Sequence, residues 1–121
     1  MKYDDNNIFA KILRGEIPCE KIYEDDFVLS FYDINPQKKI HALVIPKGKY
    51  IDLDDFSSKA TPEEMTGLLK GINTVAKKLG ISVDTGKGYR ALTNISEDGG
   101  QEVPHLHFHL FGGEKVGKMV G

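Results

Sequence analysis

The sequence predicts an α+β fold in which helices cover one face of a mainly antiparallel sheet. Two observations carry this prediction. Helical patterns occur near the amino end and in the middle of the chain, and short strand-like runs lie on both sides of the second pattern. The chain has 121 residues, which is enough for one modest hydrophobic core but not for two. We therefore expect residues 1–121 to form a single domain.

Two helices are expected. The first spans residues 7–14, where Asn7 can cap its start and Gly15 suits the position after its end. The second begins at residues 61–64, Thr-Pro-Glu-Glu, which form a capping box with proline in the first turn, and it ends before Gly80. An apolar stripe at helical spacing follows this cap and consists of Met65, Leu68, Leu69, Ile72, Val75, Ala76 and Leu79.

The remaining apolar runs predict strands. We expect them over residues 21–23, 27–32, 41–45, 89–93 and 103–111. An acidic turn at residues 24–26 joins the first two strands as a hairpin, and Pro46 ends the third. A polar loop at residues 94–101 leads toward the last strand, which Gly112 and Gly113 terminate.

Composition and charge exclude several classes of protein. The formal net charge is -2, so the chain lacks the basic excess that is typical of nucleic-acid-binding proteins. Cys19 is the only cysteine, which excludes a disulfide within the chain. The first residues are acidic, and no run approaches the ~20 apolar residues that span a bilayer. We expect a cytoplasmic protein whose partners are neither nucleic acids nor membranes.

Three of the four histidines occur at every second position, as His105, His107 and His109. Successive side chains of a strand point to opposite faces, so these imidazoles share one face at a spacing of ~6.5 Å. The opposite face carries the intervening apolar side chains, Leu106, Phe108 and Leu110. Burial of this apolar face would fix the direction in which the imidazoles point.

Such a row of imidazoles can bind a metal, can perform nucleophilic and acid–base catalysis, or can be a solvated surface. Zinc binding by alternate histidines is physically reasonable, but no Cys or Asp of the same strand completes a closed ligand set. Catalysis without a metal is therefore favoured. The glycine-rich turn at residues 98–101 supports this hypothesis, because glycine lets backbone N–H groups approach an anion such as a phosphate.

The segment 105–111 matches the alternating histidine–apolar signature of the histidine triad (HIT) superfamily, which this chain resembles along nearly its whole length. Further matching segments are residues 8–12, 16–18, 31–34, 36–37, 41–47, 94, 98–101, 103 and 112–113. The matches from residue 94 onward resemble the Hint branch, the purine nucleoside phosphoramidases. The resemblance implies a HIT-like α+β fold with a five-stranded antiparallel sheet, one long and one short helix, and a two-fold homodimer.

The resemblance also implies a role for each histidine. His107 attacks the α-phosphorus of a purine nucleoside 5′-phosphoramidate and becomes nucleotidylated, which splits one displacement into two easier steps. His105 orients His107, His109 binds the phosphate oxygens, and His41 completes the set from a neighbouring strand. No cofactor and no metal are expected. The phosphate-binding residues of the family correspond to Asn94, Gly100, Gln101, Glu102 and Val103.

A nucleoside pocket follows from the same resemblance. Its positions correspond to Ile8, Phe9, Ile12, Phe31, Tyr32, Asp33 and Ile34. The apolar members would sandwich the purine, and Asp33 would accept hydrogen bonds from the ribose hydroxyls. Without the resemblance, the aliphatic residues and Phe31 would be assigned to the core and Asp33 to a turn. The expected partners are a small-molecule purine nucleotide and a second copy of the chain.

Two positions depart from the family pattern. Some relatives bind zinc through a Cys-x-x-Cys motif in the first helix, but Asn7 and Ala10 stand there and neither supplies a thiolate. We therefore expect no zinc at that position. Glu102 stands where serine is common, near the leaving group. Because a carboxylate repels a phosphate, we hypothesise that Glu102 faces the amine leaving group or contributes only its backbone N–H.

Other functions stay open. A dinucleoside polyphosphate hydrolase or a nucleotidyl transferase of the same superfamily would use the same histidines, although Gly112 and Gly113 favour the Hint branch. A nucleotide-binding or scaffold protein with little catalysis is a second alternative, against which the intact set of four histidines argues. A metal-binding module that uses the same imidazoles is the third.

Overall fold

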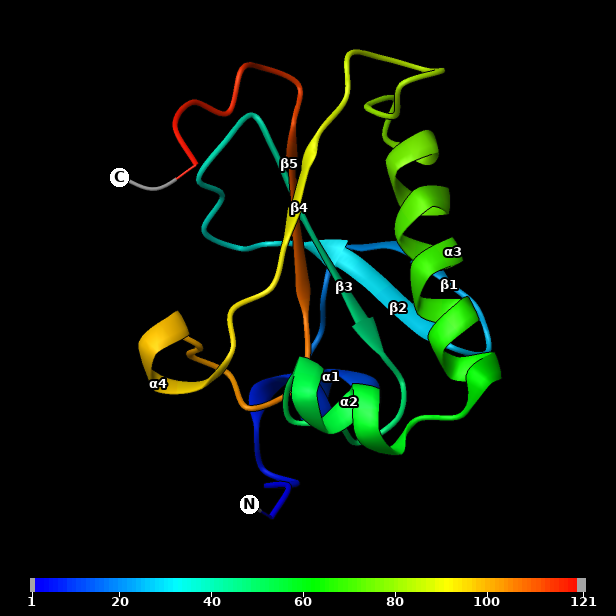
Figure 1. Ribbon diagram of the computed structural model, residues 1–121, viewed down its shortest axis with the longest axis vertical. Coiled ribbons are helices and arrows are strands. Elements are labelled where there is room, and N and C mark those ends of the chain that lie inside the picture. Colours follow the sequence, from blue (N-terminus) through cyan, green and yellow to red (C-terminus); the bar gives the residue numbers. More distant parts are fainter. Residues whose placement is uncertain (1, 120–121) are drawn as a thin grey trace.

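One antiparallel sheet organises the chain. The computed structural model describes residues 2–119. Its strands are β1 (Lys21–Glu24), β2 (Val28–Tyr32), β3 (Ile40–Pro46), β4 (Arg90–Leu92) and β5 (Phe108–Gly112). They form a five-stranded sheet in the order β1-β2-β3-β5-β4, and every neighbouring pair is antiparallel (Figure 1). The predicted α+β fold with a five-stranded antiparallel sheet is confirmed.

Side-chain caps determine where the two predicted helices begin. The helices of the described residues are α1 (Ile8–Leu13), α2 (Leu53–Lys59), α3 (Pro62–Lys78) and α4 (Ser96–Gly99). The side chain of Asn7 accepts the N–H of Ala10 (2.9 Å) at the start of α1. Thr61 and Glu64 form the predicted capping box of α3, each side chain accepting the other's backbone N–H. Within residues 2–119, no helix combines the length and the apolar character that crossing a bilayer requires.

Both faces of the sheet are covered. Helix α3 packs on one face, where residues such as Val44, Leu106 and Leu110 form the larger core (Figure 1). Helix α1 packs on the other, over a smaller core made of Phe9, Leu29, Phe31, Leu43 and Ile45. The prediction that helices cover a single face is therefore wrong. Its physical reason lies in β3, where residues of both faces are apolar and buried, so that each face needs a cover.

Strand β5 begins at Phe108, so the prediction of a strand over 103–111 is wrong for the part before this residue. Pro104 has no N–H to donate to a neighbouring strand. The N–H of His105 turns back to the carbonyl oxygen of Val103 (2.8 Å) instead of joining the sheet. The histidines at 105 and 107 thus precede the strand, and the spacing along an extended chain does not apply to them.

Helices α2 and α4 have no counterpart among the predicted elements. Asp52 caps α2 by accepting the N–H of Asp55 (2.8 Å), and α2 places Phe56 in the larger core. Helix α4 occupies part of the expected polar loop and is capped by Gly100, whose φ of 77° lies in the left-handed region that glycine adopts without strain. Both helices are too short to produce an apolar period that sequence analysis can detect.

Candidate active site

A cavity of about 460 Å³ opens on the α1 face of the sheet, a volume that suits a small molecule. Its lining combines a few apolar groups with polar side chains from distant parts of the chain. The lining residues are Phe9, Asp33, Asn35, Gln37, His41, Leu43, Asn94, Gly100, Glu102, Val103, His107 and His109. Within residues 2–119, this lining contains two carboxylates and neither Lys nor Arg.

Three histidines converge on the cavity. In the register of β3 and β5, His41 pairs with Phe111 and Leu43 pairs with His109, so the two imidazoles come from adjacent strands and the same face. The ring centroids of His41 and His109 are 5.2 Å apart, and those of His107 and His109 are 5.1 Å apart. The structure therefore brings His41 of β3 close to His107, which directly precedes β5, and to His109, which lies in β5.

Hydrogen bonding determines which nitrogen of His107 carries the proton. Nδ1 of His107 lies 2.7 Å from the carbonyl oxygen of His105. A carbonyl oxygen can only accept, so Nδ1 of the neutral ring is protonated and Nε2 has a free lone pair. No buried side-chain nitrogen or oxygen of the described residues lacks a partner, which means that the unpartnered Nε2 is open to the cavity. Phe9 supports the ring edge-to-face, with centroids 4.9 Å apart.

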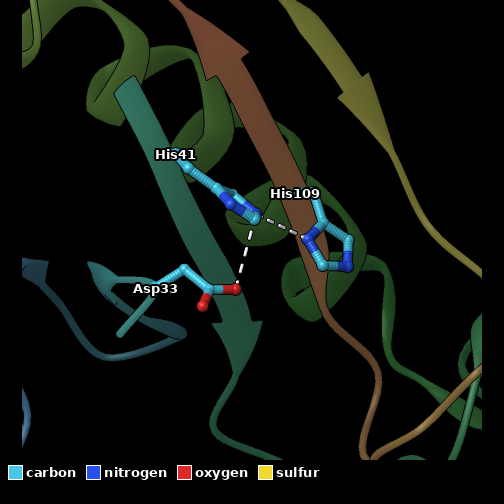
Figure 2. A group of neighbouring side chains, drawn as sticks. All are labelled: Asp33, His41 and His109. Carbon is cyan, nitrogen blue, oxygen red and sulfur yellow. Dashed lines mark hydrogen bonds and ion pairs between the residues drawn. The ribbon is translucent and has the colours of Figure 1, made fainter. Parts of the chain in front are cut away.

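His41 and His109 form a second ordered pair, which Figure 2 shows together with Asp33. Nδ1 of His41 accepts the backbone N–H of Gln37 (3.1 Å), so the proton of the neutral ring lies on Nε2. This Nε2–H donates to Nδ1 of His109 (2.9 Å), with a carboxylate oxygen of Asp33 3.4 Å away (Figure 2). His109 consequently carries its proton on Nε2, and presents a donor to the cavity where His107 presents a lone pair.

His105 is not part of the cavity lining. Its imidazole is fully buried, and both ring nitrogens have protein partners. Nε2 donates to the carbonyl oxygen of Pro46 (2.9 Å), and Nδ1 accepts the hydroxyl of Tyr3 (2.6 Å). His105 therefore contacts His107 through its backbone carbonyl. Its imidazole instead binds Pro46 and Tyr3.

Burial lowers the pKa of all four imidazoles below the usual histidine value. The pKa values of His105 and His109 fall to about 4, because the charge of a neighbouring imidazolium adds to the effect of burial. The pKa of His107 is lowered by burial, which is partly offset by the hydrogen bond to the carbonyl of His105 and, to a smaller extent, by the negative charges of Asp33 and Glu102. All four rings are accordingly neutral at neutral pH, as the proton assignments above require.

The predicted phosphate cradle is only partly available. The backbone N–H groups of Gly100 and Gln101 donate to carbonyl oxygens of α4, at 3.1 and 3.0 Å, and so are not free for a phosphate. Two of the expected phosphate-binding residues, Gly100 and Gln101, therefore do not offer these N–H groups to a phosphate, because the turn that contains them also ends α4. Among the described residues, the N–H groups of Glu102 and Val103 have no partner, and both residues line the cavity with Asn94.

The side chain of Gln101 stabilises this loop from outside the cavity. Its Nε2 donates to the carbonyl oxygens of Ile51 (2.7 Å) and Val103 (3.0 Å), and its Oε1 accepts the N–H of Ser96 (3.0 Å). Gln101 thus connects both ends of the loop to the segment before α2. These hydrogen bonds determine where the free N–H groups of Glu102 and Val103 lie.

Two of the predicted nucleoside-binding residues, Phe9 and Asp33, line the cavity. Phe31 lies behind Phe9 in the core under α1, with ring centroids 5.6 Å apart, and Ile12 packs against the same core. These two side chains support the cavity wall without forming it.

Three further predicted residues do not reach the cavity. Tyr32 packs against the core under α3, because successive side chains of β2 alternate between the two faces of the sheet. Ile8 and Ile34 are 42% and 94% exposed, and neither lines the cavity. Of the segment 31–34, only the side chain of Asp33 lines the cavity.

Asp33, His41 and His109 also resemble a metal site, since one potential ligand atom from each lies within 4.8 Å of the others (Figure 2). Coordination by Nε2 of His41 would move the proton of the neutral ring to Nδ1, where it would oppose the N–H of Gln37. That hydrogen bond therefore disfavours a metal here. Within the described residues, the three alternating histidines do not form a metal-binding group, and the absence of a metal stays a prediction.

Comparison with known proteins decides the family. The family model described as HIT domain matches residues 14–116. The chain belongs to the HIT domain family. Among HIT relatives, an uncharacterized 13.2 kDa HIT-like protein of Azospirillum brasilense is 53% identical over 118 residues, which cover 98% of this chain and 94% of that protein. A purine nucleoside phosphoramidase of Escherichia coli K12 is 40% identical over 117 residues, with coverages of 96% and 94%.

Solved HIT structures support the same conclusion. A HIT family hydrolase from Clostridium thermocellum superposes with a TM-score of 0.85 at 37% identity, covering 97% of this chain and 98% of that one. A histidine triad protein from Clostridium difficile superposes with a TM-score of 0.80 at 42% identity, covering 98% of both chains. The arrangement of the sheet described above is therefore that of the HIT fold.

The HIT cavity includes three residues that the sequence does not single out, Asn35, Gln37 and Leu43. Leu43 follows His41 at the strand period of two, and this signal places both on one face. The loop that carries Asn35 and Gln37 is recognisable from Asn-Pro, but no sequence pattern shows where the N–H of Gln37 points. The contact that determines which nitrogen of His41 is protonated therefore cannot be inferred from the sequence.

We expect the stability of this HIT domain to decrease as the pH falls from about 6.5 toward 4. In the folded state the pKa values of His105 and His109 are about 4, below the ordinary value of 6.5 that they regain on unfolding. Between these values the unfolded chain binds protons that the folded chain does not, so the free energy of unfolding falls with pH and is unaffected above this range. Urea-unfolding midpoints measured from pH 7.5 to 4.5 test this.

The carboxylates provide the internal control for this titration. Glu24, for example, has a pKa lowered to about 2 by its hydrogen bonds with Lys21 and Lys47, so its contribution disappears only below its ordinary value of 4.5. A decrease already visible between pH 6.5 and 5 therefore belongs to the histidines. A constant urea midpoint between pH 7 and pH 5 would contradict the prediction.

Proposed function

We propose that this HIT domain is a Hint-branch purine nucleoside phosphoramidase, which acts in the cytoplasm as a homodimer and hydrolyses the P–N bond of purine nucleoside 5′-phosphoramidates. The observation that carries the proposal is the hydrogen bond from Nδ1 of His107 to the carbonyl of His105 (2.7 Å). It keeps the lone pair of Nε2 available to the cavity at neutral pH, as a nucleophile requires. The name of the Escherichia coli relative supports the choice of substrate.

The reaction proceeds in two displacements at phosphorus. Nε2 of His107 forms a bond to the α-phosphorus, the P–N bond breaks, and the amine leaves with the electron pair of that bond. A water molecule then attacks the phosphorus, the bond to Nε2 breaks, and the nucleoside monophosphate is released. The departing amine takes up a proton from solvent, and the attacking water later returns a proton to solvent while its hydroxyl remains on phosphorus, so that one water is consumed in total. The covalent intermediate replaces one difficult step with two easier ones.

Neutral donors stabilise the negative charge that develops on the phosphoryl oxygens. The Nε2–H of His109 donates from β5, and the free N–H groups of Glu102 and Val103 donate from the loop after α4. The side-chain amide of Asn94 lies in the same lining. Donors that are fixed before the reaction need no reorganisation during it, which makes this contribution large in many enzymes.

Other residues of the cavity lining suit the nucleoside. Phe9 and Leu43 provide an apolar wall for the purine. One carboxylate oxygen of Asp33 accepts the N–H of Asn35 (2.8 Å), and the other lies 3.4 Å from Nε2 of His41. A carboxylate has about four acceptor sites, so Asp33 retains capacity for the ribose hydroxyls. The carboxylate would thereby connect sugar binding with the orientation of the histidine pair.

A fluorogenic adenosine 5′-phosphoramidate tests the proposal directly. We expect the purified protein to hydrolyse it at the same rate with and without excess EDTA. In samples quenched during turnover, intact-mass measurement should detect protein that carries one adenylyl group. A wild-type protein that is inert toward phosphoramidates but cleaves dinucleoside polyphosphates would favour the alternative hydrolase. Turnover that EDTA abolishes would instead implicate a metal at Asp33, His41 and His109.

A further inference from the structure

Tyr3 lies outside the cavity, yet its hydroxyl is 2.6 Å from Nδ1 of His105. We propose that Tyr3 is a positioning residue for the reaction, which holds His105 in the conformation whose backbone carbonyl orients His107. The kinetic part of this inference rests on the proposed phosphoramidase function. No motif of the chain points to Tyr3, because it stands far from the histidines in sequence.

His105 is completely buried, with a relative exposure of 0%. Its Nε2–H donates to the carbonyl oxygen of Pro46 (2.9 Å), which leaves Nδ1 of the neutral ring as an acceptor. Among residues 2–119, the hydroxyl of Tyr3 is the donor that satisfies this acceptor. A buried acceptor without a donor is costly, so this orientation of the ring depends on Tyr3.

The backbone and the packing of His105 connect its ring to the nucleophile. The carbonyl of the same residue accepts Nδ1–H of His107 at 2.7 Å, and its N–H turns back to Val103 at 2.8 Å. Phe9 contacts both imidazoles edge-to-face, with centroid distances of 6.4 and 4.9 Å. A change in the ring of His105 therefore reaches the carbonyl and the packing that determine where Nε2 of His107 points.

The segment that carries Tyr3 is anchored through Asp5. A carboxylate oxygen of Asp5 is 2.8 Å from Nζ of Lys49, and the backbone carbonyl of Asp5 accepts a hydrogen bond from the Arg14 guanidinium at 2.8 Å. The aromatic ring of Tyr3 also meets His105 edge-to-face, at a centroid distance of 5.7 Å. The hydroxyl is consequently presented to His105 from a fixed position.

Tyr3→Phe removes only the hydroxyl and keeps the ring contact with His105. We expect kcat to fall about tenfold while KM stays within about twofold, because the variant disturbs the alignment of the nucleophile and no contact with the substrate. The matched control is Tyr23→Phe, which also loses a hydroxyl bonded to a side chain, here Asp25 (2.8 Å) on the β1–β2 hairpin. This control should leave both constants unchanged. Equal kcat values for the two variants would overturn the proposal.

Long-range ¹H–¹⁵N spectra of the histidine rings provide a readout without substrate. In the wild type, His105 should be the Nε2–H tautomer with a hydrogen-bonded Nδ1, and His107 the Nδ1–H tautomer. In Tyr3→Phe, the Nδ1 signal of His105 and the Nδ1–H signal of His107 should both shift. An unchanged His107 signal would overturn the proposal, even if the wild type had no phosphoramidase activity and the proposed function had failed on its own.

A second variant covers the case in which Tyr3→Phe is too unstable to study. The double variant Arg14→Met/Lys49→Met removes both partners of Asp5, and so loosens the segment that carries Tyr3 without altering the cavity lining. The signals of His105 and His107 should then broaden or shift together. Signals identical to those of the wild type would show that the position of Tyr3 does not affect the nucleophile, and would overturn the proposal.

Discussion

Replacing His107 by alanine is expected to lower kcat for an adenosine 5′-phosphoramidate by at least about 10⁴-fold. The reason is that no other imidazole offers a free lone pair in its neutral form. The unprotonated nitrogens of His41, His105 and His109 each accept a hydrogen bond from a protein donor. Nε2 of His107 is therefore the one unengaged imidazole acceptor among the described residues of the cavity.

Turnover in single-substrate kinetics with excess EDTA measures this effect, and the thermal unfolding midpoint of His107→Ala shows whether the variant is folded. Free imidazole provides the positive control. It can enter the space left by the missing ring and restore part of the turnover through a diffusible nucleotidyl-imidazole. Turnover within about tenfold of the wild type in His107→Ala, without added imidazole, would exclude this residue as the nucleophile.

Leu110→Ala is expected to lower the free energy of unfolding by about 3 kcal/mol and the thermal midpoint by roughly 10 °C. Leu110 is completely buried in the core under α3, on the face of β5 opposite His109. Its register partners are Ala42 on β3 and Ala91 on β4. Because these neighbours are small, they cannot fill the space that the lost side-chain atoms leave behind.

The matched control for this prediction is Leu69→Ala. It makes the same chemical change on the outer surface of α3, where Leu69 is 68% exposed. We expect it to change the free energy of unfolding by less than about 0.5 kcal/mol. Urea unfolding followed by circular dichroism compares the two variants. Equal effects would show that burial at Leu110 does not account for the stability of the sheet.

Local signals explain which parts of the fold can be predicted from sequence. Helix α3 is encoded by a capping box and an apolar stripe, both of which act within a few residues. The capping box is confirmed, and so is the stripe except at Leu69, which is exposed. The start of β5 depends on distant contacts, because the segment before it is held by Tyr50 and Pro46, through hydrogen bonds to Leu106 and His105. Such partners cannot be inferred from the alternating histidine pattern, which is why the strand is predicted too long.

The candidate site likewise combines features that local sequence patterns predict with features that depend on distant contacts. The alternating histidines and His41 are recognisable as a group, and the structure brings three of the four to one cavity. The positions of their protons depend on the Gln37 N–H, the His105 carbonyl and the Tyr3 hydroxyl. Each of these groups lies in a loop, and its effect depends on the direction of one individual bond. No periodicity or motif of the sequence predicts such a direction.

The lining of the cavity carries fixed charge of one sign only, from Asp33 and Glu102. A bound phosphate would thus be stabilised by the dipoles of neutral donors, and every additional negative charge on the ligand would add repulsion. A nucleoside phosphoramidate has a single negative charge at its one phosphorus, whereas a dinucleoside polyphosphate brings one for each phosphate group. The net charge of the ligand therefore distinguishes two substrate classes that could both react with the four imidazoles, and the cavity favours the monoanion.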